Sequence, residues 1–173
     1  MKKILISFIF IAAYAICPAQ EYSIPELTSA QKHSRMLYIN HNFIISTIAT
    51  AKNAGVSIED NASFVSDYVK TTWDKEAGFE GFVKGTIYNW ENFRRESDPP
   101  MEIEQQTDNQ ITVKYKNNFM ELFEKGDIFN VSYDEFMDWM IIMHRRIGEY
   151  LGGNFEMRKT KDGWLYLVIT RIE

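Results

Sequence analysis

Cysteine is almost absent from this chain: Cys17 is the only one among 173 residues. It follows a short apolar run, residues 4–16, so its role depends on whether this segment stays on the protein. If the segment is removed, the mature chain has no thiol. Disulfides, thiol catalysis and cysteine-ligated zinc or iron–sulfur centres are then excluded, and the domain must be held together by packing alone.

The first residues match the pattern of a secretory signal peptide. Lys2 and Lys3 give a short basic start, the apolar run follows, and Ala19 supplies a small residue for cleavage. We therefore expect an exported protein, periplasmic or extracellular, with a signal peptide over residues 1–19 and one domain over residues 20–173. The run is shorter than the roughly 20 apolar residues that span a bilayer, so we expect no stable membrane insertion after cleavage.

Two alternatives to this interpretation remain open. In the first, Cys17 is the lipid-anchored first residue of a lipoprotein. Such signals favour a small residue directly before the cysteine, where this chain has Ile16. In the second, the apolar run stays on the protein as the first helix of the domain.

Long basic clusters are also missing. Removing Lys2 and Lys3 leaves 17 basic against 24 acidic residues, a net charge of −7, and no basic cluster is longer than the pair Arg145 and Arg146. Nucleic-acid binding needs a positive surface, and anionic lipid surfaces attract basic segments. We therefore expect neither nucleic acid nor a membrane surface as a partner.

The pattern of apolar residues predicts helices and hairpins in a fixed order. Helical spacing predicts three helices, at residues 29–54, 58–77 and 79–97. A hairpin over residues 103–115, a short helix at 119–125, a longer helix at 133–151 and a second hairpin with Asp162 and Gly163 at its tip follow.

These elements predict a single α+β domain, with about five helices packed on a small antiparallel sheet made of two β-hairpins. The hairpins are expected to join, because an isolated hairpin is marginally stable in water. The last strand, residues 164–172, is apolar on both faces, which is typical of a central strand covered on both sides.

Two histidines are the candidates for chemistry. His41 and His144 both lie near apolar stripes of their helices, and they could form a site with a carboxylate such as Asp74 or Glu135. The other interpretation makes each imidazole a core residue with one hydrogen bond. The sequence has no HExxH, GxSxG or P-loop motif, so we predict no catalytic residue beyond these candidates, no metal site and no cofactor.

A glycine strip gives the second candidate site. Gly81 and Gly85 leave one side of the third helix smooth, which either permits close packing or leaves room for a ligand beside Trp73, Tyr88 and Trp90. Apolar and aromatic walls with few polar groups are typical of a ligand site. The sequence therefore favours a non-enzymatic module that binds a small apolar ligand or a protein partner. The alternative is a hydrolase or metal-assisted enzyme that uses the two histidines.

Overall fold

The computed structural model describes residues 26–172. The predicted signal peptide, its cleavage site after Ala19 and the alternative lipid anchor at Cys17 lie outside these residues. Within them, none of the helices combines the length and the apolar character that a membrane span requires.

Five α-helices and two short 3₁₀ turns make up the helical part of the described chain. They are α1 (Ser29–Asn53), α2 (Ile58–Val69), η2 (Lys70–Thr72), η3 (Lys75–Ala77), α3 (Gly78–Phe93), α4 (Phe119–Leu122) and α5 (Tyr133–Tyr150). Capping boxes open the two longest helices, with Thr28 and Gln31 at α1 and Ser132 and Glu135 at α5. Each box satisfies two backbone N–H groups that the start of a helix leaves without partners.

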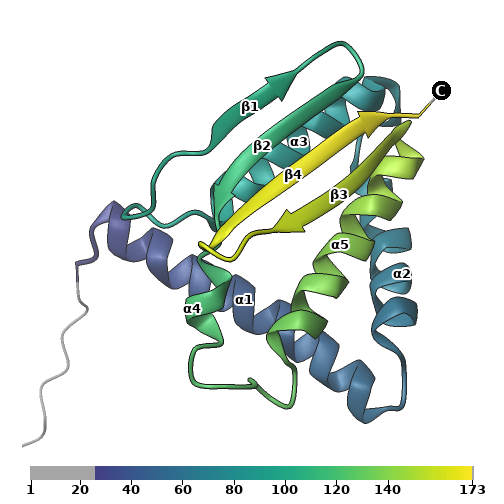
Figure 1. Cartoon of the computed structure of the whole chain (residues 1–173). Coiled ribbons are helices and arrows are strands. Elements are labelled where there is room, and N and C mark those ends of the chain that lie inside the picture. The colour runs from purple at the N-terminus through teal and green to yellow at the C-terminus, as the bar shows by residue number, and fades with distance from the viewer. Residues whose placement is uncertain (1–25, 173) are drawn as a thin grey trace, which may run out of the picture.

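The four strands form one antiparallel sheet in the order β1–β2–β4–β3. They are β1 (Glu102–Gln106), β2 (Gln110–Lys116), β3 (Gly153–Lys159) and β4 (Trp164–Arg171). Each hairpin is one pair of neighbours, and the pairing of β2 with β4, in which Val113 lies opposite Leu167, joins them. The predicted α+β class is therefore confirmed, with five helices and two hairpins combined in a single sheet (Figure 1).

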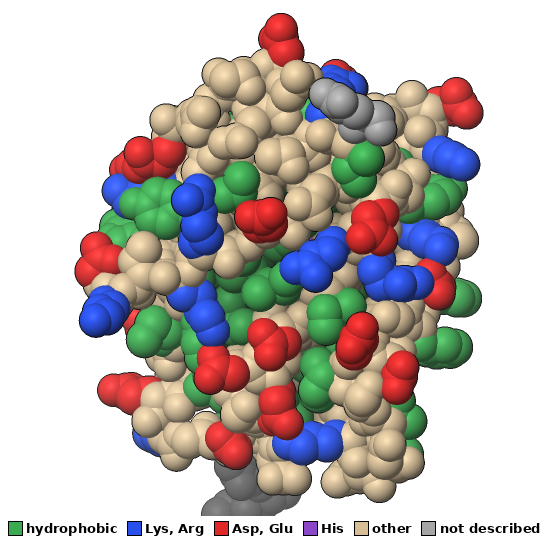
Figure 2. Space-filling model, turned by 45° about the vertical axis from the view of Figure 1, so that its right-hand side comes forward, with side chains coloured by type: hydrophobic (Ala, Val, Ile, Leu, Met, Phe, Trp, Pro, Cys, Tyr) green, Lys and Arg blue, Asp and Glu red, His purple; other side chains and the backbone are tan. Residues whose placement is uncertain are grey.

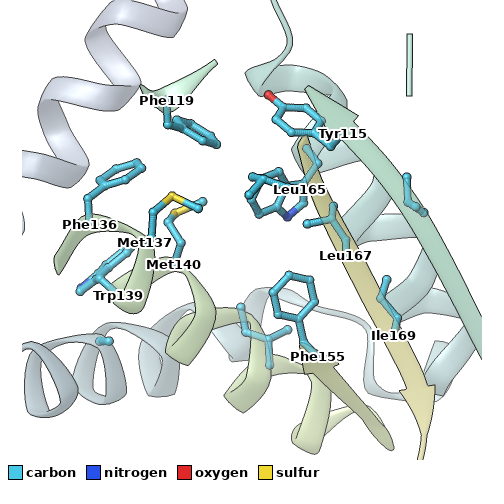
Figure 3. Close-up of a cluster of buried hydrophobic side chains, with 14 of the residues drawn as sticks. Tyr115, Phe119, Phe136, Met137, Trp139, Met140, Phe155, Leu165, Leu167 and Ile169 are labelled. Carbon is cyan, nitrogen blue, oxygen red and sulfur yellow. The ribbon is translucent and has the colours of Figure 1, made fainter. Parts of the chain in front are cut away.

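The core lies between the sheet and the helices on one of its faces. In the view of Figure 1, α3 lies behind the sheet and α5 runs alongside β3. Leu165, Leu167 and Ile169 of β4 point toward α5, whose side chains Met137 and Met140 face them (Figure 3). All five side chains are almost completely buried, so the contacts of its inner face hold the central strand β4 against α5.

The other face of β4 differs from the expectation that both sides would be covered by further elements. Trp164 lies on this outer face, and the Nζ atoms of Lys114 and Lys116 on β2 lie 4.5 and 5.2 Å from the centroid of its ring. Lysine stems can cover apolar surface while the ammonium groups stay in water and interact with the aromatic face. On this outer face, two lysines of the neighbouring strand thus cover Trp164.

The second predicted helix, residues 58–77, is divided in the structure. Helix α2 ends at Val69, and Trp73 has an extended backbone (φ −91°, ψ 140°) between η2 and η3. The hydroxyl of Thr72 donates to the carbonyl oxygen of Val69, and the side chain of Asp74 caps the next turn. Such local side-chain bonds compete with a continuous helix, and the break directs Trp73 toward α3.

Candidate functional site

The indole of Trp73 lies against α3 at Gly85. A Cβ atom added at Gly85 would overlap the six-membered ring of this indole. A helix interior uses glycine where another group must approach the backbone this closely, because any side chain would fill the same space. The group that packs closely against α3 at Gly85 is thus the side chain of Trp73. Among the described residues, no other helix or strand packs as closely there.

An outer hollow of about 580 Å³ opens beside this contact. Trp73 and Asp74 line one side of it, and Gly85 and Tyr88 of α3 line the other. The Tyr88 side chain is 61% exposed, so it stands at the rim. Three of the four residues predicted to bind a ligand, Trp73, Gly85 and Tyr88, therefore surround one hollow.

A second, inner hollow of about 310 Å³ adjoins the first and shares Val69, Trp73 and Asn89 with it. Its floor is α5, which contributes Met140, Met143, His144 and Ile147. We call the two hollows together the α2–α3 groove. It runs between the α2–η3 segment and α3, with α5 beneath it and Asn40 and Ile44 of α1 at its inner end.

Trp90, the fourth predicted ligand-binding residue, lies in the core and not in the groove. Its side chain is fully buried, and its ring centroid lies 5.1 Å from that of Tyr115 and 5.8 Å from that of Phe119. On α3 it is five residues from Gly85, which places it on the side of the helix that faces the sheet. Packing therefore accounts for Trp90, as it does for most tryptophans at helical spacing.

Both ring nitrogens of His144 are used inside the core. The indole Nε1–H of Trp90 donates to Nε2 of His144 at 3.2 Å, and Nδ1 of His144 lies 2.8 Å from the carbonyl oxygen of Met140. Because the indole is only a donor, Nε2 must be the acceptor and Nδ1 must carry the proton. Burial lowers the pKa of His144 to about 4 and keeps the imidazole neutral. This ring has no nitrogen left for a metal or a substrate.

His41 lies on the other side of the same aromatic cluster. Its ring stacks on Phe93 at a centroid distance of 5.6 Å and meets the edge of Phe119 at 5.4 Å. Burial lowers its pKa to about 4. Within residues 26–172 no ring contact joins His41 to His144, because the path between them runs through Phe93 and Trp90. The two candidate imidazoles are not assembled into one site.

The candidate carboxylates have structural roles at helix starts. Asp74 accepts a hydrogen bond from the backbone N–H of Glu76 at 3.0 Å and caps η3. Glu135 accepts from the backbone N–H of Ser132 at 2.8 Å and forms an ion pair with Lys52 at 2.6 Å. The Lys52 hydrogen bond, followed by the Ser132 backbone, holds the pKa of Glu135 below its usual range. In the described part of the chain, no three His, Asp or Glu side chains are grouped as metal ligands.

The groove also contains polar residues that the sequence analysis missed. Asn40 of α1 and Asn89 and Asn92 of α3 line the inner hollow. On α3, Asn89 follows Gly85 by four residues and Asn92 follows it by seven, so they share a helix face with the glycine. A projection of residues 78–93 onto a helix would have placed both amides beside the glycine strip.

No protein-family model, curated protein or solved structure matches this chain. The role of the groove is therefore argued from its own chemistry. It can bury an apolar group against α5 and offer neutral amide hydrogen bonds at its rim. At its outer end it also presents one anion, Asp74, and one cation, Lys84.

Proposed function

We propose that this chain is an exported, non-enzymatic binding module that holds an apolar ligand in the α2–α3 groove. The ligand is a small molecule or an apolar segment of a partner protein. One observation carries the proposal: the inner hollow is lined mostly by apolar side chains, among them the partly exposed Ile44, Val69 and Met143, and it opens between α2 and α3.

The composition of this floor supports binding energetically. Covering apolar surface contributes about 25 cal/mol for each Å² removed from water. Methionine side chains are flexible and polarisable, so the half-buried Met143 can adapt to ligands of different shape. Trp73, which lines both hollows, adds a large aromatic wall. The groove therefore combines the apolar lining and the few polar groups that ligand sites usually have.

Two features favour a binding role over catalysis. Both ring nitrogens of His144 already form hydrogen bonds, one with Trp90 and one with Met140. The carboxylates of Asp74 and Glu135 cap the starts of helical segments. General acid–base catalysis needs a titratable group within hydrogen-bond reach of a substrate. The hydrolase or metal-assisted alternative, which depends on these residues, has no comparable support.

The distribution of charge agrees with an uncharged ligand and with the absence of nucleic acid among the expected partners. Figure 2 shows acidic and basic side chains interspersed with hydrophobic ones on the face that it presents. Acidic side chains gather in the lower part of that face, and no continuous basic area is visible on it. Nucleic-acid binding usually requires a continuous basic area.

The export part of the proposal rests on residues 1–19 alone. The mass of the protein recovered from its cell should correspond to a chain that starts at Gln20. An acyl group on Cys17 would replace this part of the proposal with the lipoprotein alternative. An intact leader would contradict export by a cleaved signal.

The groove itself is tested by titrating the protein with neutral apolar compounds and recording its indole N–H resonances by NMR. We expect the Trp73 resonance to shift, because Trp73 lines both hollows. Trp164 is the internal control, since it lies on the outer face of the sheet under two lysines. Equal shifts at both indoles, or none at Trp73, would count against the proposed site.

A further inference from the structure

Helices α1 and α2 expose five large apolar side chains to water. Three of them are aromatic: Phe43, Phe64 and Tyr68 are 70, 76 and 78% exposed. The other two, Met36 and Ile39 of α1, are about half exposed. Helical spacing places Met36, Ile39 and Phe43 on one side of α1, and it places Phe64 and Tyr68 on one side of α2. We call these five residues the α1–α2 face.

The two halves of this face lie at the edge of the inner hollow. Ile44 and Val65, which follow Phe43 and Phe64 in the sequence, both line that hollow. The helices themselves diverge from the turn over residues 54–57 (Figure 1). None of the five residues of the face lines either hollow of the groove. The face therefore adjoins the proposed ligand site without being part of it.

Charged residues are missing from the middle of the face. Residues 36–51 of α1 include no Asp, Glu, Lys or Arg, and neither do residues 61–66 of α2. The side of a helix that faces water normally carries charged and polar residues. Depletion of charge together with exposed aromatic and methionine side chains is the composition of the centre of a protein–protein interface.

The exposed apolar area of the face matches what a dimer needs. A buried Phe or Tyr covers about 150–250 Å², so the three aromatic side chains at 70–78% exposure present roughly 450 Å². A standard interface buries about 800 Å² of each partner, and about 65% of a homodimer interface is apolar, which corresponds to roughly 520 Å². Met36 and Ile39 supply the remainder. Apolar patches of this size commonly mark interaction sites.

The charges at the two ends of the face favour a second copy of this chain over an unrelated partner. Lys32 precedes Met36 by four residues and lies at the end of the face that is far from the turn. Asp60 precedes Phe64 by four residues and lies next to the turn. Both charged residues are exposed. In a symmetric dimer the same surface meets itself, so a two-fold axis across the face brings each Lys32 opposite the partner's Asp60.

We infer that this protein forms a symmetric homodimer in which the α1–α2 faces of two copies cover each other, with Lys32 of each copy paired with the partner's Asp60. The inference does not depend on the proposed function, because the face and the groove have no residue in common.

The test uses the purified chain that starts at Gln20 and measures its mass by sedimentation over a range of concentrations. We expect a dimer whose dissociation constant rises at least about tenfold in Phe64→Ser and in Ile39→Ser, because each substitution removes an apolar contact from both copies. The matched control is Ile103→Ser, at an exposed isoleucine of the edge strand β1, which should leave the dissociation constant unchanged. Circular dichroism checks that the variants fold.

The pairing of charges is tested by reversal. Lys32→Asp and Asp60→Lys should each raise the dissociation constant about fivefold, because each places like charges at both ends of the interface. The double variant should restore it to within about twofold. A monomer at all concentrations, a dimer that the face variants do not weaken, or an equal loss in Ile103→Ser overturns the inference. A double variant that is no tighter than the single ones overturns the arrangement of the two copies. Ligand-induced shifts at Trp73 remain a separate measurement, so the proposed function can stand or fail without the dimer.

Discussion

The indole Nε1–H of Trp90 donates a hydrogen bond of 3.2 Å to Nε2 of His144 within the core. The bond joins α3 to α5 beneath the sheet and determines which ring nitrogen of His144 carries a proton. Removing this hydrogen bond should change the free energy of unfolding by a measurable amount. We expect His144→Leu to lower the free energy of unfolding by about 1–3 kcal/mol, because the indole N–H is left buried without an acceptor.

The matched variant for this test is His144→Gln, whose side-chain carbonyl can accept the same bond. Urea denaturation followed by fluorescence should find it more stable than the leucine variant. If the leucine variant is equally stable or more stable, the bond does not contribute as described.

The pH dependence of stability follows from the same residue. The pKa of His144 is lowered to about 4 in the folded protein, against an ordinary value of 6.5. Between these values the unfolded chain binds a proton that the folded chain does not, so stability is lost as the pH falls from about 6.5 to 4. The slope for this histidine alone is about 1.4 kcal/mol per pH unit.

His41, whose pKa is also lowered to about 4, adds to the loss in the same direction. Denaturation at a series of pH values should therefore show a smaller slope in His144→Gln than in the unaltered protein. A slope that is unchanged in this variant would show that the pH dependence arises elsewhere.

Because Trp73 contacts Gly85, the effect of Gly85→Ala on the free energy of unfolding should change sign when Trp73 is removed. Alone, Gly85→Ala should destabilise the protein by about 1–3 kcal/mol, because the new methyl group overlaps the indole. In a Trp73→Ala background the same change should stabilise by up to about 1 kcal/mol, because alanine is the better helix former. Thermal or urea denaturation of the four proteins tests this, and the same sign in both backgrounds would contradict the contact.

The turn that follows α3 depends on Asp98, which is 8% exposed. Its carboxylate forms an ion pair with Arg95 at 2.7 Å and accepts a hydrogen bond from Asn118 at 2.9 Å. Burial alone would raise the pKa of Asp98, but the bonds from Arg95 and Asn118 outweigh it and lower the pKa. We expect Asp98→Asn to cost about 2 kcal/mol of unfolding free energy.

The control for this change is Glu121→Gln, which removes the other carboxylate that binds Arg95. Glu121 has a side chain 60% exposed, and an exposed pair contributes between about 0 and 1 kcal/mol. Comparable losses in the two variants would show that burial of Asp98 is not what makes its interactions strong.

The class of the fold could be predicted because the helical spacing, the capping residues and the turn residues all indicate the same elements. Helical spacing, the capping residues before α1 and α5, and the turn at Asp162 and Gly163 all indicate the elements that form. The run of apolar residues in β4 indicated its central position between β2 and β3. These signals are local, so they can be read without knowing which elements meet.

The candidate site was harder to predict because it depends on contacts between distant segments. Nothing near Trp90 in sequence shows that His144 would occupy its N–H. The break after Val69, which directs Trp73 to Gly85, arises from hydroxyl and carboxylate bonds to the backbone that periodicity does not detect. The amides of Asn89 and Asn92 become a rim only because α5 lies beneath them.

The central claim, that the α2–α3 groove binds an apolar ligand, is tested most directly by NMR with labelled methionine methyl groups. Once a neutral apolar compound or peptide is bound, it should show nuclear Overhauser contacts to the methyl group of Met143, which is half-buried in the lining of the groove. Met120 on α4, which is 49% exposed and lies outside the groove, should show none. Contacts to Met120 in place of Met143 would contradict the account.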